Sequence, residues 1–377
     1  MEDPNSAETY AKIKSLAELL SSTPRKRAIA FTGAGISASA GINEQEFPEH
    51  FETTTAPLPT NQFALEQAIP TQAHMSLAKL ADEGYLSYVA TCNIDGLHRR
   101  SGVQPARLGE LYGNVFLETC PKCRAEYLRD YDVAMHRNRA ALAELADVHA
   151  TGRQCTTPGC DGMLRDTLVR NEETLAEPVI TRALQEALQA EVVFCLGSNL
   201  ESSPFCELPV AAKERGAQLI IVGPERTMLD GVADVRLRMS PDRFAEMLMK
   251  SLGKAIPKFA LRKPIWIGNT HEMVTPEKGF DTENRHKWTV FVRGDNNSPL
   301  NFIDRVEFRL APSFDPALIV LEEPPFELTR VGRGPFEVLI TIHLTHNFRR
   351  GSLTFRHMLL FQDIGEQKCV QIDLTGV

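Results

Sequence analysis

Residues 28–41 read Ala-Ile-Ala-Phe-Thr-Gly-Ala-Gly-Ile-Ser-Ala-Ser-Ala-Gly, and this stretch decides the fold of the larger part of the chain. Its apolar start predicts a buried strand, and the Gly/Ser/Ala-rich turn from Thr32 to Gly41 is expected to open a helix. Gly33 and Gly35 let the backbone of such a turn approach a pyrophosphate at a helix N-terminus. Taken alone this indication is weak, because Gly41 is displaced from the usual dinucleotide spacing.

Helical and strand-like segments alternate on both sides of this stretch. Such alternation predicts a Rossmann-like α/β fold with a doubly wound parallel sheet, because parallel strands need crossover connections. The predicted helices span 8–22, 74–82, 133–148, 180–190 and 242–252, and the further strands span 86–91, 192–196 and 218–222.

Four cysteines interrupt this pattern. Cys120, Cys123, Cys155 and Cys160 form C-x2-C, a 31-residue gap and C-x4-C. Four thiolates brought together in this way bind one tetrahedral Zn²⁺, and the ion holds together a subdomain that has no core of its own. We therefore expect a zinc module, at about residues 118–166, inserted into the α/β unit.

The pattern of residue types in the sequence changes after Pro257. Short β-branched and aromatic runs separated by turn residues predict an all-β, antiparallel, immunoglobulin-like sandwich. We expect an α/β domain at residues 1–253, a linker at 254–262 and the sandwich at 263–377. The predicted strands of the sandwich span 287–292, 304–310, 317–321, 336–344 and 352–361.

Composition and charge exclude several classes of protein. Of the 377 residues, 43% are hydrophobic and 24% are charged, and the net charge is −8. This charge argues against a general nucleic-acid binder, and direct nucleic-acid binding is not indicated. No segment resembles a signal peptide or approaches the ~20 apolar residues of a membrane span, so we expect no membrane association. Cysteine usage favours a reducing, intracellular compartment over a disulfide framework.

A second polar motif follows the strand predicted at 86–91. Alone, its Asn93 and Asp95 are more typical of turn caps than of catalytic residues. The motif is, however, one of a series, which runs Gly33-Ala-Gly-Ile-Ser37, Pro70-Thr-Gln-Ala-His74, Asn93-Ile-Asp-Gly-Leu-His98, Gly113-Asn114, the cysteine quartet and Gly197-Ser198. These phrases stand in the order found in sirtuins, and residues 10–253 resemble the nuclear branch of that family.

The resemblance implies an NAD-dependent protein-lysine deacylase, an activity that some members combine with ADP-ribose transfer. It implies that Ala34, Gly35 and Ser37 hold the pyrophosphate of NAD with help from a helix dipole. Asn93 and Asp95 would line the nicotinamide and ribose pocket. The zinc would be structural, because four thiolates leave no open coordination position. The other positions assigned to the cofactor are Gly33, Cys92, Gly197, Ser198, Asn199 and Gly223.

Tyr112 stands where the family has its catalytic histidine, directly before Gly113. In the family's mechanism that histidine deprotonates a ribose hydroxyl. A phenol with a pKa of about 10 stays protonated at neutral pH, whereas imidazole titrates close to neutrality. Because general-base catalysis contributes about 10²–10⁴-fold, the substitution predicts lost or strongly weakened deacylation. The alternative, an activated tyrosinate, requires a strong cationic neighbour.

Further departures from the family pattern fall in the same cleft. Glu46 replaces an arginine that faces phosphate and ribose, and an acid there repels a pyrophosphate. Cys92 replaces a glutamine of the nicotinamide pocket. Asn199 replaces a serine beside the ribose, Gly223 replaces an asparagine, and Asn171 replaces an aromatic of the acyl-lysine channel. This accumulation favours relaxed catalytic constraint.

The tail contains the phrases His286-Lys-Trp-Thr-Val-Phe-Val-Arg-Gly294, Phe302-Ile-Asp-Arg-Val-Glu-Phe308 and Gly332-Arg-Gly-Pro-Phe336. Through these and other phrases, residues 262–361 resemble a YEATS domain, the acyl-lysine reader of chromatin complexes. In that family two aromatic rings sandwich the planar acyl amide, which gains from stacking and from the exclusion of water. The resemblance therefore implies a second site for acylated lysine.

One of the two rings is replaced in this chain. Phe314 matches the first ring and Ser313 is retained, but Arg333 stands at the second ring and Ala311 replaces a histidine of the pocket. A guanidinium at that position stacks over an amide or binds an acidic group. Without the resemblance, Phe314 is typical of a sandwich core.

Two functional hypotheses follow. The first is an NAD-dependent deacylase or ADP-ribosyltransferase that its tail delivers to chromatin. The second is a scaffold that binds nucleotide and acylated peptide, with deacylation lost or strongly weakened, and Tyr112, Glu46 and Arg333 favour it. A third option, that Tyr112 is an introduced substitution in an active chain, leaves the other departures unexplained. The expected partners are histones or other acylated-lysine proteins of a chromatin complex, and both resemblances imply a nuclear location.

Overall fold

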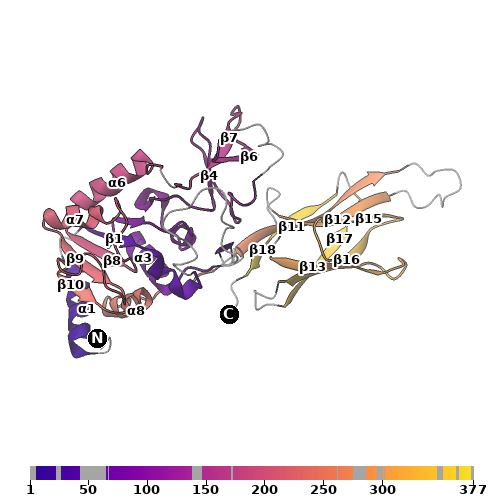
Figure 1. Ribbon diagram of the computed structural model, residues 1–377. Helices are drawn as coiled ribbons and strands as arrows, with labels where there is room; N and C mark the ends of the chain where they lie inside the picture. The colour runs from indigo at the N-terminus through magenta and orange to yellow at the C-terminus, as the bar shows by residue number, and fades with distance from the viewer. Residues whose placement is uncertain are drawn as a thin grey trace. The chain divides into compact units, whose positions relative to one another are not determined.

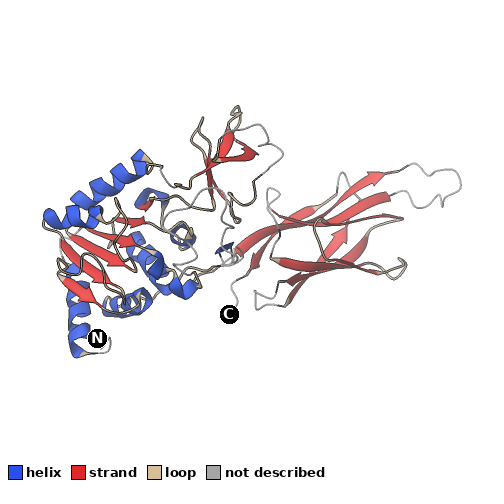
Figure 2. Ribbon diagram, viewed as in Figure 1, coloured by secondary structure: helices blue, strands red, loops and turns tan. Residues whose placement is uncertain are grey.

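The computed structural model divides the chain into two compact units, Met1–Phe259 and Ala260–Val377 (Figure 1). Among the described residues, every α-helix lies in the first unit, and strands make up the second (Figure 2). The described residues are 6–22, 27–42, 65–66, 68–137, 147–170, 173–260, 262–274, 286–294, 300, 302–345, 351–361 and 365–374.

The first unit is built on a six-stranded sheet in the order β10-β9-β8-β1-β2-β3. Every pairing in it is parallel, which confirms the predicted α/β fold. β1 lies at the centre because all five of its residues are buried and it pairs with β8 on one side and β2 on the other. The strands are β1 (Ala28–Thr32), β2 (Tyr88–Thr91), β3 (Leu108–Glu110), β8 (Val192–Leu196), β9 (Gln218–Val222) and β10 (Val235–Leu237).

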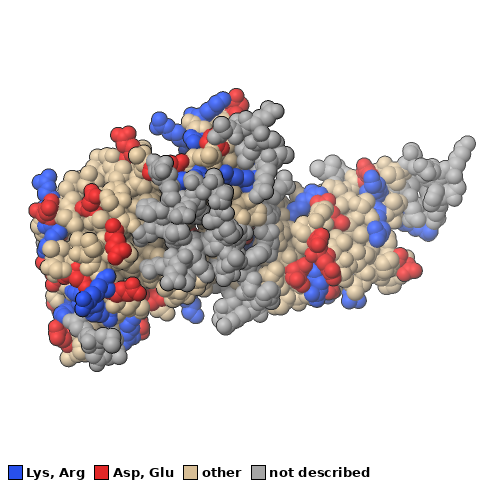
Figure 3. Space-filling model, in the orientation of Figure 1, with Lys and Arg blue, Asp and Glu red and all other residues tan. Residues whose placement is uncertain are grey.

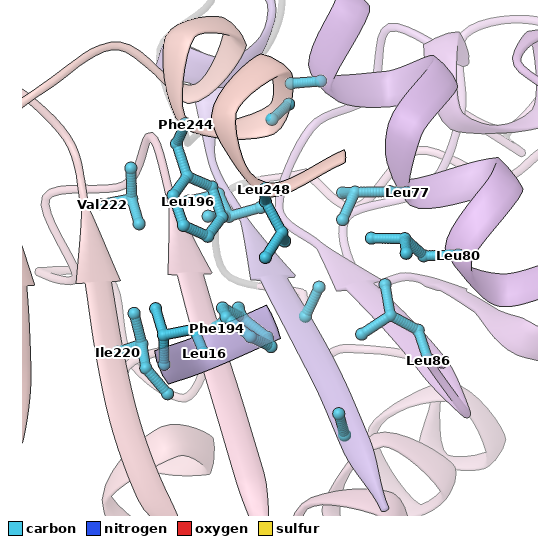
Figure 4. Close-up of a cluster of buried hydrophobic side chains, with 14 of the residues drawn as sticks. Leu16, Leu77, Leu80, Leu86, Phe194, Leu196, Ile220, Val222, Phe244 and Leu248 are labelled. Atoms are coloured by element: carbon cyan, nitrogen blue, oxygen red, sulfur yellow. The ribbon is translucent and has the colours of Figure 1, made fainter. Parts of the chain in front are cut away.

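Helices cover both faces of this sheet. Successive residues of β1 point to opposite faces, so Ala30 enters one apolar cluster and Phe31 the other. Helices α1, α3 and α8 pack on the first face, where Phe194 of β8 meets Phe244 of α8 (Figure 4), and α6 and α7 pack on the second. The helices are α1 (Ala7–Leu20), α3 (Gln72–Asp82), α4 (Leu97–Arg100), α6 (Glu177–Leu188), α7 (Glu207–Glu214) and α8 (Pro241–Ser251).

The Gly-rich turn after β1 differs from its prediction. Within the described residues it forms two short 3₁₀ turns, η1 (Ala34–Ile36) and η2 (Ala38–Ala40), instead of an α-helix. Gly41 ends the second turn with φ of 82°, a conformation that favours glycine. The alternation of small residues gives no apolar face on which a helix could pack. The expected help from a helix dipole therefore has no basis in these residues.

Other differences concern missed elements and uncertain segments. The sequence analysis did not predict the strands of the inserted module or, in the second unit, the strands Arg262–Met273, Phe326–Gly332 and Gln367–Asp373. The sequence analysis missed β3, β10, α4 and α7, which are too short for hydrophobic periodicity to reveal them. Of the helix predicted at 133–148, residues 133–137 form turns, and most of the remainder lies outside the described part of the chain.

The inserted module is a small antiparallel sheet in the order β5-β4-β7-β6. Buried Glu118 of β4 binds the guanidinium groups of Arg129 and Arg153, which gives this module a polar interior beside its cysteines. Its strands are β4 (Leu117–Thr119), β5 (Glu126–Leu128), β6 (Ala150–Gln154) and β7 (Met163–Asp166).

The second unit consists of two antiparallel sheets, β15-β12-β11-β18 and β14-β13-β16-β17, which confirms the predicted sandwich. Trp288, Val290 and Phe308 are among the fully buried side chains of its core. Arg262, predicted to end a linker, is instead the first residue of β11. The strands are β11 (Arg262–Met273), β12 (His286–Gly294), β13 (Ile303–Arg309), β14 (Leu318–Leu321), β15 (Phe326–Gly332), β16 (Phe336–Leu344), β17 (Ser352–Leu359) and β18 (Gln367–Asp373).

Charge and hydropathy of the surface are mixed. Lys and Arg side chains are interspersed with Asp and Glu on the face drawn in Figure 3. In the part of the chain that the structure describes, no helix is both long and apolar enough to cross a bilayer.

Candidate nucleotide cleft, zinc centre and reader site

The predicted cofactor residues lie at the carboxyl ends of the parallel strands. Gly33–Gly35 follow β1, Cys92–Asp95 follow β2, Tyr112 follows β3, Gly197–Asn199 follow β8, and Gly223 follows β9. The chain winds outward from β1 in one direction and from β8 in the other, so the sheet changes direction between these two strands. Ligands of open α/β sheets bind at such a switch point. The topology thus places all of these loops at the edge where a ligand is expected.

Glycines allow the loop after β1 and the loop after β8 to pack closely against each other. The amide of Gly35 donates to the carbonyl oxygen of Gly197 at 2.8 Å. A Cβ on Gly33 would lie 2.7 Å from the Cβ of Ser198, and one on Gly35 would lie 2.9 Å from the Gly197 carbonyl oxygen. Contacts this short exclude any side chain at either position, so glycine is needed here for close approach of the backbones.

Ser37, Asn93 and Asp95 form one buried hydrogen-bonded group. The Ser37 hydroxyl donates to Asp95 Oδ2 at 2.6 Å, and Asn93 Nδ2 donates to the Ser37 Oγ at 3.2 Å and to the Gly33 carbonyl at 3.1 Å. Asp95 Oδ1 accepts the amide of Leu97 at 2.9 Å. The sequence predicted all three polar residues as site residues, and they lie together beneath the Gly-rich turn.

Two of the three residues expected to hold a pyrophosphate have their amides engaged within the protein. The amide of Gly35 binds Gly197, and that of Ser37 binds the Ala34 carbonyl at 2.9 Å. Among the described residues, the amide of Ala34 has no such partner. Ser198 is half-buried, so part of it is exposed. Its Oγ accepts the amide of Leu200 at 3.1 Å. Ala34 and Ser198 are therefore the donors best placed for an anion.

Tyr112 is enclosed by apolar side chains. It is 5% exposed and belongs to the same cluster as Cys92 and Leu111, and its carbonyl oxygen accepts the amide of Val169 at 3.1 Å. The next residue, Gly113, has φ of 88°, and a Cβ there would lie 2.0 Å from the Thr167 carbonyl oxygen. The backbone at this point is fixed against the segment that leaves the zinc module, and the side chain before it packs within an apolar cluster.

A pair of buried histidines lies below the cleft. The rings of His74 and His98 are 4.6 Å apart, and His98 Nε2 lies 2.8 Å from the Thr32 hydroxyl. Burial lowers the pKa of each imidazole to about 3, so both are neutral at physiological pH. The two side chains are 0% and 1% exposed. The sequence analysis quoted both residues within motifs but assigned them no role.

Glu110 is a further polar residue that the sequence analysis missed. It accepts bonds from Arg99 Nε at 2.8 Å and from Asn114 Nδ2 at 2.6 Å. Burial raises its pKa to about 7, against the opposing attraction of Arg99. Its position two residues before Tyr112 was the feature of the sequence that could have identified it as a residue near the site. Its contacts indicate that it orders the loop around Gly113.

The outer loops of the cleft have more room. Asn199 Nδ2 donates to Glu201 Oε2 at 3.0 Å. A Cβ on Gly223 would meet no atom within 4 Å, and the Gly223 carbonyl accepts Arg236 Nη1 at 2.9 Å. A longer side chain at residue 223 thus fits the fold. Glu46 and Asn171, two of the predicted departures, lie outside the described residues.

The four predicted metal ligands converge on one point. Their sulfur atoms all lie within 4.8 Å of one another, and the pairs Cys120–Cys160 and Cys123–Cys155 are 3.6 and 3.5 Å apart. A tetrahedral Zn²⁺ with Zn–S bonds of about 2.3 Å requires S···S distances of about 3.8 Å. Gly162 makes space for this cluster, because a Cβ there would lie 2.5 Å from Cys120 Sγ. The residues fit a structural zinc ion, as predicted.

Of the residues predicted to form a reader site in the second unit, Phe314 lies in an aromatic group. Phe314 is half-buried, with ring centroids 5.8 Å from Trp288 and 5.1 Å from Phe336. It is thus both a core-packing residue and a partly exposed ring. Ser313 and Arg333 are exposed.

Comparison with known proteins gives the following relationships. A model of the Sir2 family matches residues 45–204, and a model of the YEATS family matches residues 283–363. The NAD-dependent protein deacetylase SRT1 of Arabidopsis thaliana is 32% identical over 85% of this chain, which spans 65% of the plant protein. The NAD-dependent protein deacetylase sirtuin-7 of Homo sapiens is 32% identical over 80% of this chain and 74% of its own length. A solved structure of Sir2 with the inhibitor EX-527, 2′-O-acetyl-ADP-ribose and a deacetylated p53 peptide is 29% identical, with a TM-score of 0.49 over 64% of this chain and 100% of that chain.

Proposed function

The chain belongs to the Sir2 family and carries a YEATS domain, and from this premise we propose that it is a nucleotide- and acyl-lysine-binding scaffold with weakened deacylation. The observation that carries the proposal is Tyr112, a phenol packed among apolar side chains where the family places its base. We propose that it works at chromatin in the nucleus, with histones or other acylated proteins as partners.

Retained groups support nucleotide binding. The buried group of Ser37, Asn93 and Asp95 supplies polar atoms at the switch point of the sheet, and Ala34 and Ser198 supply donors for the phosphates. When bound, NAD would supply the ribose carbon that the acyl oxygen of a substrate lysine attacks as nicotinamide leaves. Asn93 and Asp95 would orient the nicotinamide ribose, and this orientation itself does not depend on a proton acceptor.

Weakened turnover is expected because the described cleft residues include no imidazole at the position of the family's base. The deacylation step needs a group that removes a proton from a ribose hydroxyl, and Tyr112 is a poor base at neutral pH. Among the described residues, the two histidines nearest in the motifs, His74 and His98, are enclosed and neutral. The second candidate, an active deacylase or ADP-ribosyltransferase, is favoured only by the intact Ser37–Asn93–Asp95 group.

Nicotinamide release by the full chain tests this proposal. With NAD and an acetylated histone peptide, release is expected to stay near background, and Tyr112→His is expected to restore it only in part because other cleft positions also depart from the family. Tyr112→Phe is the matched control and should change nothing. Robust release by the unaltered chain would reject the proposal in favour of the active enzyme. Calorimetry with ADP-ribose shows separately whether the cleft still binds a nucleotide.

For the second unit, we propose a reader fold with weakened affinity for neutral acyl-lysine. Phe314 offers one aromatic wall, but Arg333 replaces the second. Acetyl- and crotonyl-lysine peptides are expected to bind weakly, and Arg333→Trp is expected to improve their binding. Tight binding of crotonyl-lysine by the unaltered chain would show that the second aromatic ring is dispensable.

A further inference from the structure

We infer that His149 is a positioning residue of the nucleotide cleft, because its protonated ring ties Asp166 to Glu173 and so holds the segment that leaves the zinc module against the cleft. The inference rests on the proposed nucleotide-binding function and adds a control by pH to that site. It depends on one imidazole that lies between two carboxylates.

Asp166, the last residue of β7, is a fully enclosed carboxylate. Its Oδ1 lies 2.8 Å from His149 Nδ1. Its Oδ2 accepts Arg137 Nη2 at 2.7 Å and Arg170 Nη2 at 3.0 Å. A buried carboxylate requires such partners, because its removal from water is unfavourable unless counter-charges and hydrogen bonds compensate. The carboxylate thus joins three separate segments of the zinc module and of the chain that leaves it.

The second nitrogen of the same imidazole faces Glu173. His149 Nε2 lies 2.8 Å from Glu173 Oε1, and Glu173 Oε2 accepts the backbone amide of Arg170 at 2.8 Å. Both ring nitrogens donate at once only when the ring is protonated, since a neutral imidazole carries a single N–H. A neutral ring therefore gives up its bond to one of the two carboxylates.

The segment that follows Asp166 lies against the cleft. The Val169 amide donates to the Tyr112 carbonyl oxygen at 3.1 Å, and the Thr167 hydroxyl accepts the Asn114 amide at 3.0 Å. Tyr112 stands at the position that the sirtuin resemblance places beside the ribose. The bonds that fix residues 166–170 therefore also fix the backbone of the cleft next to the proposed ribose position.

The charged groups around this imidazole come from several segments. They are Asp166 of β7 with its partner Arg137, Arg170 and Glu173 from the segment after β7, and Asp147 with its partner Arg165. The carboxylates attract a proton to the ring. The guanidinium of Arg170, whose Nη1 lies 2.6 Å from His149 Nδ1, opposes this attraction.

The balance of these charges favours the protonated ring. The hydrogen bond to Asp166 is the main cause that raises the pKa of His149 above its ordinary value. Both bonds of the ring are therefore complete below a pH of about 6.5, the ordinary value of an imidazole. One of them is lost as pH rises through the raised value, so the segment is held less firmly in mild alkali.

Calorimetry of the full chain with ADP-ribose between pH 6 and pH 8.5 tests the inference. His149→Arg keeps a cation with several donors at every pH and is the reference. We expect the affinity of the unaltered chain, relative to that of His149→Arg, to fall about fivefold from pH 6 to pH 8.5. Glu110, whose pKa is about 7, titrates in both proteins, so the comparison isolates His149.

His149→Gln removes the charge altogether. Its affinity for ADP-ribose should be about fivefold weaker than that of the unaltered chain at pH 6 and equal to it at pH 8.5. The control is His136→Gln, which removes an imidazole that lies 3.3 Å from Glu66, and it should follow the unaltered chain at every pH. All variants should keep about one zinc per chain.

The possible outcomes are distinguishable. Parallel pH profiles for the unaltered chain and His149→Arg overturn the inference and leave nucleotide binding standing. Loss of zinc from His149→Arg assigns the imidazole to the folding of the module and overturns the inference as well. If none of the proteins binds ADP-ribose at any pH, the proposed nucleotide site falls together with its control.

Discussion

The zinc module and the nucleotide cleft of the first unit differ in what their residues must do. In the module, four thiols replace a core, and each of them has to be cysteine. In the cleft, one set of positions is fixed by close backbone packing, as at Gly35 and Gly113. At another set the side chain differs from the family, as at Tyr112, which packs among apolar side chains, and at Gly223, where a Cβ meets no atom within 4 Å. Among the described residues, the departures from the sirtuin pattern fall in the second set. The positions that hold the backbone together and the positions that differ from the family are thus separate here.

Removal of the metal should have the largest effect. Cys155→Ser leaves three thiolates for the ion, and the binding free energy of a structural zinc, about 10 kcal/mol or more, is also folding free energy. We expect loss of about one zinc per chain, measured by mass spectrometry, together with proteolysis within residues 118–166. Cys369→Ser, at an exposed position on β18, is the control and should keep both properties. Full zinc content in the Cys155 variant would contradict the ligand assignment.

A matched pair of glycine substitutions separates the two kinds of cleft position. Gly113→Ala combines a φ of 88° with a Cβ 2.0 Å from the Thr167 carbonyl oxygen, so urea unfolding should show a loss of about 3 kcal/mol or more. Gly223→Ala meets no atom within 4 Å and should change the free energy of unfolding by less than about 0.5 kcal/mol. Similar losses for both variants would remove the distinction drawn between these positions.

The buried histidine pair predicts a loss of stability in acid. The pKa of His74 and of His98 is about 3 in the folded chain and about 6.5 in the unfolded chain. The unfolded state therefore binds more protons between these values, so stability falls as pH drops through 6.5. Between pH 7.5 and 5 the loss amounts to about 2 kcal/mol per imidazole.

Urea unfolding of His74→Gln at the same two pH values isolates this contribution. The variant should lose less stability in acid than the unaltered chain. His149, whose pKa is raised mainly by its bond to Asp166, has an effect of opposite sign that is present in both proteins and cancels in the difference. His136→Gln, which removes a half-exposed imidazole, serves as the control. Identical pH profiles for all three proteins would show that the pair titrates normally.

The smallest expected effect lies at the open end of β9. Gly223→Asn returns the family's side chain to a position with space for it, and one added hydrogen bond to a ribose contributes about 0.5–1.5 kcal/mol. We expect calorimetry to show ADP-ribose binding about three- to tenfold more tightly. Gly223→Ala, which fits but has no polar atom, should bind as the unaltered chain does. No gain with asparagine would mean that a bound nucleotide does not approach this loop.

The sequence correctly predicted the parts of the molecule that are marked by an apolar run or by a motif of characteristic spacing. The strands at Val192–Leu196 and Gln218–Val222 match their predictions, because fully apolar runs mark a buried parallel strand. The cysteine quartet was read from spacing alone. The strand β3 and the helix α7 were missed because they are short, and tertiary pairing rather than local pattern determines them.

The residues of the site could be predicted from their motifs, but the contacts between these residues could not. Ser37, Asn93 and Asp95 were named from the sequence, yet the bond between Ser37 and Asp95 joins loops that follow two different strands. The engagement of the Gly35 amide by Gly197 depends on the same pairing of distant loops. Burial of His74 against His98 arises from the packing of α3 on α4, which no local pattern encodes.

The place of the zinc module in the chain bears on the timing of assembly. The central strand β1 finds its partner β8 only after the whole module has been synthesised, since Ala28 pairs with Val192. Pairing between such distant segments is slow, because a long loop must close first. An ion that clasps Cys120 to Cys160 shortens that loop in advance. In a growing polypeptide, metal capture would thus set the moment at which the sheet can close.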